Sequence, residues 1–198
     1  MVTVPALPKN RPADALISCV IPAYNEAAHL ADFLRDLRQT LAGFATRYEI
    51  IVINDGSSDN TDQVMAPLLA ESGLRYISFS RNFGKEAALS AGIDAAQGDA
   101  VILMDSDYQH PLELLPEMTR LWQSGIDMVY GVISDRSNES RLKRWGTGMF
   151  YHLMESGSPI TIPRNAGDFR LMDKQVVQAL RQLPERNRFM KGLYACCL

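Results

Sequence analysis

With 198 residues, of which 46% are hydrophobic and 22% charged, the chain is long enough to bury the core of one soluble globular domain. Its three cysteines, Cys19, Cys196 and Cys197, form neither a disulfide framework nor a metal-ligand spacing, so we expect a reducing compartment such as the cytosol. No apolar run reaches the roughly 18 residues of a membrane-spanning helix, and neither a signal peptide nor C-terminal membrane segments are expected.

The net charge of -3 conceals an uneven distribution. Residues 1–135 carry 9 basic and 18 acidic side chains, whereas residues 136–198 carry 11 basic and 5 acidic ones. The basic C-terminal third is either a solvated face or a surface for an anionic partner such as a phospholipid headgroup or a lipid phosphate. No nucleic-acid partner is expected.

Strands and helices are expected to alternate along the chain, because short apolar runs alternate with segments of helical periodicity. The expected strands are 16–21 (ended by Pro22), 48–53, 74–79, 100–104 and 127–133, and the expected helices are 25–41, 61–71, 85–97 and 111–124. This order predicts an α/β domain over residues 16–198, with a mostly parallel central sheet and helices on both faces. Residues 1–15 are expected to form a flexible N-terminal arm.

The expected strand at 100–104 leads directly into Asp105, Ser106 and Asp107, with Gln109 two positions further on. Strands of open α/β sheets present ligand-binding groups at their carboxyl ends. Carboxylate and amide oxygens suit Mg²⁺ or Mn²⁺, and such ions take further ligands from phosphates. The segment therefore indicates a metal–diphosphate site, and the alternative is a solvated acidic turn.

Three other loops follow expected strands at the same edge. Tyr24 can stack on a base and Glu26 can bind a ribose hydroxyl, while Asp55 can accept a hydrogen bond from a base N–H. Arg81 and Lys85 lie at the start of a helix, where anions bind readily. Turn and cap chemistry explains each loop equally well in isolation, but together the loops favour a nucleotide-diphosphate site.

Several blocks of the sequence resemble family 2 glycosyltransferases, and in particular the polyprenyl-phosphate hexosyltransferases, which include dolichol-phosphate mannose synthases and bactoprenol-phosphate glucosyltransferases. The blocks are Val-Ile-Pro-Ala-Tyr-Asn-Glu (20–26), Asn-Asp-Gly-Ser-Ser-Asp (54–59), Arg-Asn-Phe-Gly (81–84), Asp-Ser-Asp-Tyr-Gln-His-Pro (105–111) and Gly-Asp-Phe-Arg-Leu-Met (167–172). The resemblance extends over about residues 17–194.

The resemblance implies a GT-A (Rossmann-like) fold and an inverting transfer of a hexose from UDP-glucose or GDP-mannose to a polyprenyl phosphate, with Mg²⁺ or Mn²⁺. The implied nucleotide-sugar-binding residues are Pro22, Tyr24, Glu26, Asp55, Arg81, Lys85, Asp105 and Ser106. The implied metal-binding residues are Asp105, Asp107 and Gln109, of which the last two are preferred as direct ligands. The implied catalytic residues are Asp107, Asp168 and Arg170, and the implied acceptor-phosphate contacts are Arg136, Arg170 and Lys191.

Several alternatives stay open. Asp168 either orients the acceptor or the sugar, or pairs with Arg170 structurally. An amphipathic helix expected over 140–156 either packs on the sheet or lies in the membrane interface. The chain is expected to act at the cytoplasmic face of a membrane, with homo-oligomerisation left open. The alternative functions are transfer to a hydroxyl acceptor and an inactive nucleotide-sugar-binding module.

Overall fold

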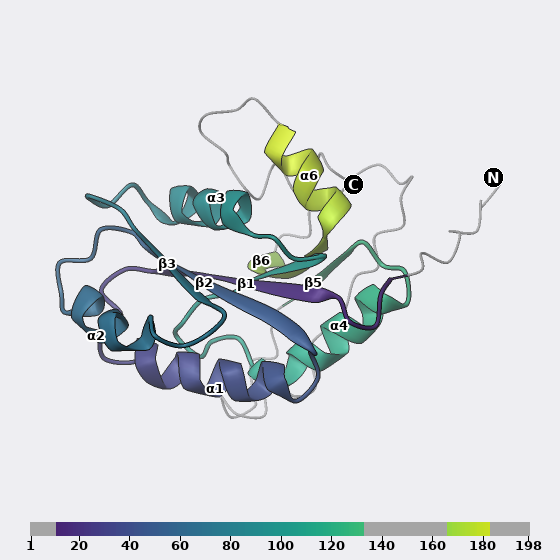
Figure 1. Cartoon of the computed structure of the whole chain (residues 1–198). Coiled ribbons are helices and arrows are strands. Elements are labelled where there is room, and N and C mark those ends of the chain that lie inside the picture. Colours follow the sequence, from purple (N-terminus) through teal and green to yellow (C-terminus); the bar gives the residue numbers. More distant parts are fainter. Residues whose placement is uncertain (1–10, 133–165, 183–198) are drawn as a thin grey trace, which may run out of the picture.

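The computed structural model describes residues 11–132 and 166–182. The strands are β1 (Leu16–Ala23), β2 (Arg47–Asn54), β3 (Leu74–Ser78), β4 (Ala100–Leu103), β5 (Met128–Val132) and β6 (Ala166–Asp173). The helices are α1 (Leu30–Ala42), α2 (Thr61–Leu68), α3 (Lys85–Ala95), the 3-10 turn η1 (Leu112–Leu114), α4 (Leu115–Gln123) and α6 (Lys174–Gln182). Helices α1, α2 and α4 cover one face of the sheet, and α3 and α6 cover the other (Figure 1). The predicted α/β architecture is confirmed.

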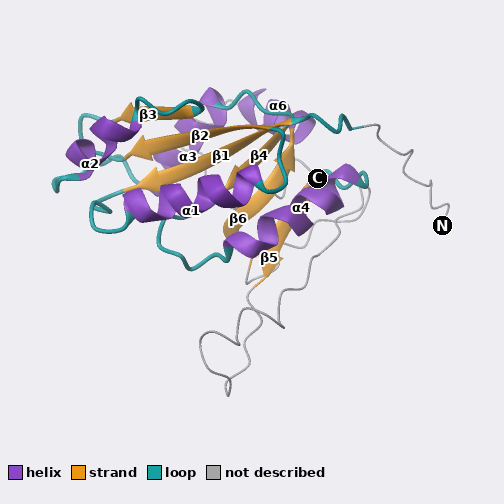
Figure 2. Cartoon of the chain, turned by 60° about the horizontal axis from the view of Figure 1, so that its bottom comes forward, coloured by secondary structure: helices purple, strands orange, loops and turns teal. Residues whose placement is uncertain are grey.

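The six strands follow the order β3-β2-β1-β4-β6-β5 (Figure 2). Strands β1 to β4 pair in parallel, whereas β6 is antiparallel to both of its neighbours. The sheet is therefore mostly parallel, as predicted. No strand was expected at β6, although Asp168, Phe169, Arg170 and Leu171 alternate between polar and apolar residues as in a strand.

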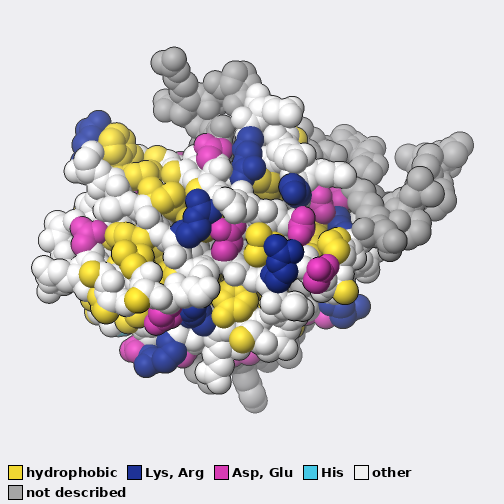
Figure 3. Space-filling view, viewed as in Figure 1, with side chains coloured by type: hydrophobic (Ala, Val, Ile, Leu, Met, Phe, Trp, Pro, Cys, Tyr) yellow, Lys and Arg dark blue, Asp and Glu magenta, His cyan; other side chains and the backbone are white. Residues whose placement is uncertain are grey.

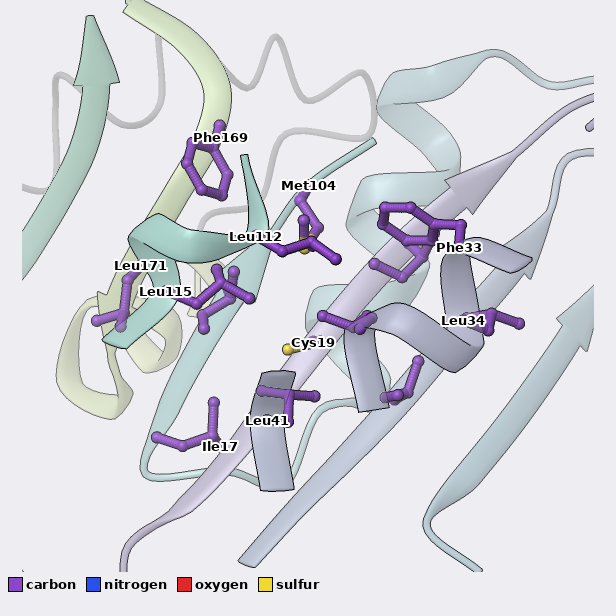
Figure 4. Packing of buried hydrophobic residues seen from close by; sticks show 14 of the residues in the cluster. Ile17, Cys19, Phe33, Leu34, Leu41, Met104, Leu112, Leu115, Phe169 and Leu171 are labelled. Atoms are coloured by element: carbon purple, nitrogen blue, oxygen red, sulfur yellow. The ribbon is translucent and has the colours of Figure 1, made fainter. Parts of the chain in front are cut away.

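Two apolar clusters, one on each face of the sheet, form the core. Cys19 of β1 lies among side chains of α1, β4, α4 and β6, including Leu41, Leu115 and Leu171 (Figure 4). Val20, the next residue of β1, belongs to the opposite cluster with side chains of α3 and α6. Because both faces of the central strands are buried, the sheet is a rigid support for the loops at its edges.

Pro22 does not end β1, which differs from the sequence-based expectation. The carbonyl of Ala23 accepts a hydrogen bond from Asp55 on the β2 side, whereas the carbonyl of Val20 accepts one from Met104 on the β4 side. Since strand residues alternate in direction, the N–H that Pro22 lacks would point past the end of β4. The proline therefore costs β1 no sheet hydrogen bond.

Helix α1 begins at Leu30, five residues later than the periodicity predicts. The backbone N–H groups of Asn25 and Ala27 donate to Ser57 Oγ (2.9 Å) and Asp59 Oδ2 (3.0 Å). Asn25 also has a φ of 57°, which a helix does not allow. The segment before Leu30 is thus held as a loop by partners about thirty residues away.

The described part of the predicted N-terminal arm packs against the domain. Arg11 Nη2 lies 2.6 Å from Asp127 Oδ1 and Nε lies 3.1 Å from Asp173 Oδ2. Its guanidinium also stacks over the ring of Trp122, at 4.8 Å from the centroid. Arg11, which lies within the predicted arm, is therefore attached to the domain. Among the described residues, no helix has the length and apolar character needed to span a membrane.

Candidate active site at the carboxyl edge of the sheet

The loops that follow β1, β2, β3 and β4 all lie at the carboxyl edge of the parallel strands. The start of β6 joins them, because β6 runs in the opposite direction and Arg170 lies opposite Leu103. The structure thus brings together the predicted residues of these five segments. Arg136, Lys191 and the helix expected at 140–156 lie outside the described residues.

The β1 and β2 loops form one hydrogen-bonded unit. In addition to the bonds of Asn25 and Ala27 described above, Asn25 Oδ1 accepts a hydrogen bond from the backbone N–H of Ser58 at 2.8 Å. Tyr24 extends from this unit and is 47% exposed. Its ring is therefore accessible to a ligand, while Pro22 is half-buried at the base of the loop.

Asp55, directly after the end of β2, holds the β3–α3 loop in place. It is only 3% exposed, and its two carboxylate oxygens accept hydrogen bonds from the backbone N–H groups of Phe83 (2.7 Å) and Gly84 (2.9 Å). Gly56, with a φ of 63°, packs directly against the backbone of Arg81. The sequence suggested a base N–H as the partner of Asp55, but its long-range partners could not be read from the sequence.

Arg81 and Phe83 form an exposed pair in the β3–α3 loop. The Arg81 guanidinium lies 4.6 Å from the centroid of the Phe83 ring, which packs edge-on against Phe79 at 5.6 Å. Arg81 is a predicted site residue, whereas its aromatic support Phe83 was not predicted. On the face shown in Figure 3, acidic and basic side chains are interspersed, so neither sign dominates there.

Lys85 connects three elements at the centre of the edge. Its Nζ lies 2.7 Å from Asp105 Oδ1 and 2.9 Å from Asp168 Oδ2. Burial lowers the pKa of Lys85, but the hydrogen bonds and charges of the two carboxylates outweigh burial and raise the pKa above its usual value. Lys85 therefore stays charged and joins the start of α3 to the ends of β4 and β6. It is half-exposed, so a ligand can still reach it.

In the 105–109 loop one buried residue is followed by three exposed ones. Ser106 is buried, whereas Asp107 and Gln109 are exposed, and Asp107 Oδ1 accepts a hydrogen bond from the Gln109 N–H at 3.0 Å. No cluster of three or more His, Cys, Asp or Glu side chains with metal-ligating geometry occurs within residues 11–132 and 166–182. The carboxylate of Asp105 is paired with Lys85. The side-chain oxygens of Asp107 and Gln109 are therefore more accessible to a metal ion than those of Asp105.

Negative charge accumulates around this loop. Burial raises the pKa of Glu26 above its usual value, and the carboxylates of Asp107 and Asp105 raise it further. Burial lowers the pKa of His110, although Asp105 and Asp107 oppose that effect. The His110 ring stacks on Phe169 with centroids 4.8 Å apart. A neutral, stacked histidine supports the loop from behind and adds no positive charge to the edge.

Arg170 lies deeper than the other predicted residues. It is 4% exposed and lies opposite Leu103 and Tyr130 in the sheet. Asp168, two residues earlier, is on the same face of β6 and is partly exposed at the edge. Arg170 therefore places a buried positive charge close behind Asp168.

The model of the glycosyl transferase family 2 matches residues 18–181. An uncharacterised glycosyltransferase of Synechocystis is 47% identical over 180 residues, which are 90% of this chain and 57% of that protein. A bactoprenol glucosyl transferase of Shigella phage SfV is 46% identical over 178 residues, which are 89% of this chain and 58% of that protein. The chain thus spans less than three-fifths of the length of these relatives.

Solved structures share the fold. A mannosyltransferase from Pyrobaculum calidifontis, in complex with GDP-mannose and Mn²⁺, superposes with a TM-score of 0.63 at 17% identity, covering 89% of this chain and 49% of that one. A glucosyl-3-phosphoglycerate synthase from Mycobacterium tuberculosis, in complex with UDP, gives 0.56 at 22% identity, covering 92% and 64%. At these identities the likeness concerns the fold alone, and the predicted GT-A fold is confirmed.

Substituting Gly56 with Ala tests the packing of the β2 and β3 loops. A Cβ at Gly56 would lie 2.1 Å from the carbonyl carbon of Arg81, whereas a Cβ at Gly84 would have no atom within 4 Å. Both glycines have positive φ, and at Gly84 (φ 95°, ψ 153°) the backbone conformation is nearly exclusive to glycine, so Gly84→Ala measures a conformational cost of up to about 3 kcal/mol without a steric contact. We expect Gly56→Ala to lower the free energy of unfolding by at least about 1 kcal/mol more, as measured by urea denaturation. Equal losses would contradict the packing.

Substituting Glu26 with Gln tests the excess of negative charge. Because the pKa of Glu26 is raised in the folded state, ionisation at neutral pH destabilises the fold, and the penalty disappears below the pKa of the unfolded chain. We expect Glu26→Gln to be more stable than the parent at pH 7 and equally stable near pH 3, about one unit below the usual pKa of Glu. Urea unfolding across this pH range measures the difference, and equal stability at pH 7 would refute the assignment.

Proposed function

Because the chain belongs to glycosyl transferase family 2, we propose that it transfers a hexose from a nucleotide sugar to a polyprenyl phosphate. The relative from Shigella phage SfV, a bactoprenol glucosyl transferase, supports the lipid acceptor and favours UDP-glucose over GDP-mannose as the donor. The observation that carries the proposal is the Lys85 bridge, because it holds the 105–109 loop and Asp168 side by side.

The donor nucleotide would bind across the β1, β2 and β3 loops. Tyr24 offers an accessible ring for the base, and Glu26 offers a carboxylate for the ribose hydroxyls. Asp55 acts mainly by fixing the backbone of Phe83 and Gly84, so its contribution to nucleoside recognition runs through that loop. Arg81 is exposed beside it and available to a phosphate.

A divalent ion, Mg²⁺ or Mn²⁺, fits the residues at the edge. Burial raises the pKa of Glu26, and the nearby carboxylates of Asp107 and Asp105 raise it further, so several acidic oxygens lie close together at this edge and such oxygens suit these metals. Asp107 and Gln109 would hold the ion directly, and Asp105 would lie beside them with its carboxylate paired to Lys85. When bound, the ion would act as a Lewis acid that stabilises negative charge on the leaving diphosphate.

The transfer step would be a single displacement. An oxygen of the lipid phosphate forms a bond to the anomeric carbon while the bond from that carbon to the donor diphosphate breaks, which inverts the anomeric centre and releases the nucleoside diphosphate. A phosphate is already anionic at neutral pH, so no strong base is needed. Asp168, held in place by its ion pair with Lys85, would orient the reactants, and Arg170 behind it would attract the acceptor phosphate.

A lipid acceptor implies action at a membrane surface, on the cytoplasmic face where nucleotide sugars are available. The basic residues of the C-terminal third and the expected helix at 140–156 are the candidates for that contact, together with Arg136 and Lys191 for the acceptor phosphate. A homo-oligomer at the membrane is compatible with this proposal.

A transfer assay tests the proposed function. The purified chain is incubated with Mg²⁺ or Mn²⁺, undecaprenyl phosphate in detergent and radiolabelled UDP-glucose or GDP-mannose. We expect label to move into the organic phase, and the successful donor identifies the sugar. Label on a water-soluble hydroxyl acceptor instead would overturn the lipid assignment. Absence of both transfer and nucleotide binding would overturn the proposed activity.

Substituting Asp107 with Asn tests the metal assignment in the same assay. Removing a charged oxygen ligand is expected to lower transfer about 100-fold or more, because the ion no longer balances the diphosphate. Glu113→Gln removes an exposed carboxylate just beyond the same loop and serves as the control, with transfer expected to stay near the parent level. Transfer by Asp107→Asn at the parent rate would rule out Asp107 as a ligand.

A further inference from the structure

We propose that Tyr108 is a positioning residue, which holds Asp107 and Gln109 in the orientation needed at the carboxyl edge through a hydrogen bond to Asp36 of α1. The existence of this anchor is independent of the proposed function, whereas its effect on the donor rests on that function. Tyr108 lies between two residues of the candidate metal site and is not itself one of the predicted site residues.

The backbone of Tyr108 is in an unusual conformation. Among the described non-glycine residues, only Asn25 and Tyr108 have positive φ, and both have a value of 57°. Asn tolerates this left-handed region through local hydrogen bonds, but a tyrosine there costs about 1–2 kcal/mol. Such a conformation persists only where the surroundings hold it in place. The side chain of Tyr108 must therefore have strong partners.

Helix α1 supplies those partners. The Tyr108 hydroxyl donates a hydrogen bond of 2.8 Å to Asp36 Oδ2, and the ring packs edge-on against Phe33 at a centroid distance of 5.3 Å. Phe33 is completely buried in the core, so this contact is rigid. Phe33 and Asp36 are three residues apart and lie on the same side of the helix. The loop is thus attached to an element of the core.

The attachment constrains the neighbours of Tyr108 because it lies inside a tight turn. Asp107 Oδ1 accepts a hydrogen bond from the Gln109 N–H at 3.0 Å, and this bond spans Tyr108. A rotation about the Tyr108 backbone would break the bond and turn both side chains. Ser106, on the other side of Asp107, is buried. The loop is therefore held at Ser106 and Tyr108, with Asp107 exposed between them.

Stacking on a base is the other role open to an exposed tyrosine. Tyr108 is 46% exposed, but its hydroxyl and ring are both engaged with α1. Tyr24, at 47% exposed, makes no side-chain hydrogen bond or ring contact within the described part of the chain. Tyr24 is therefore the better candidate for the base, and Tyr108 serves the loop.

Hydrogen exchange of the unliganded chain tests the anchor without any metal or donor. Tyr108→Phe keeps the ring and removes the hydroxyl, and Asp36→Ala removes the acceptor. We expect either change to speed exchange of the Gln109 amide about fivefold or more, because the turn opens more often. Asp32→Ala is the matched control, since its carboxylate lies on the same helix but pairs with Arg35. Parent-like exchange in both anchor variants would overturn the proposal.

Donor kinetics provide the second readout. We expect Tyr108→Phe and Asp36→Ala to raise the KM for the nucleotide sugar about threefold to tenfold with kcat changed less than about twofold, which is the range for loss of one partly exposed hydrogen bond. The double variant is expected to be no worse than either single variant, because both remove the same bond. Additive losses would overturn the proposal. Faster exchange in a chain whose parent transfers no sugar would leave the anchor standing and refute the proposed function.

Discussion

The ammonium group of Lys85 lies between two carboxylates that would repel each other without it, and the arrangement of the carboxyl edge depends on this contact. Asp105 reaches it from the end of β4 and Asp168 from the start of β6. They meet because β6 runs antiparallel beside β4, with Arg170 opposite Leu103. A parallel strand in that position would have put its own carboxyl end there instead. The reversed strand thus brings a residue from the far part of the chain to the 105–109 loop.

The polar residues of the edge fall into two groups with different physical roles. One group is used within the protein: Asp55 fixes the β3–α3 loop, Asp59 and Asn25 join the β1 and β2 loops, and Tyr108 ties the 105–109 loop to α1. The other group, Tyr24, Glu26, Asp107 and Gln109, remains accessible. Internal ties of the first group fix the geometry of the second before any ligand arrives, so binding needs little further ordering.

The sequence allowed the alternating elements, the mostly parallel sheet and the convergence of the polar loops at one edge to be predicted, because buried strands such as β1 and β4 have continuous apolar runs. The strand β6 was not predicted, although Asp168 and Arg170 alternate with Phe169 and Leu171 as in a strand, and its antiparallel place between β4 and β5 depends on pairing with distant segments. The late start of α1 and the partners of Asp55 also escaped prediction, because they depend on hydrogen bonds between residues about thirty positions apart.

The most direct test is a crystal structure of the chain grown with Mn²⁺ and the nucleoside diphosphate of the active donor, with data collected for the anomalous signal of manganese. The account predicts one strong anomalous peak within coordination distance of Asp107, the diphosphate beside it, and the base at the β1 and β2 loops near Tyr24. A manganese peak or a nucleotide at any other edge of the sheet would contradict the account.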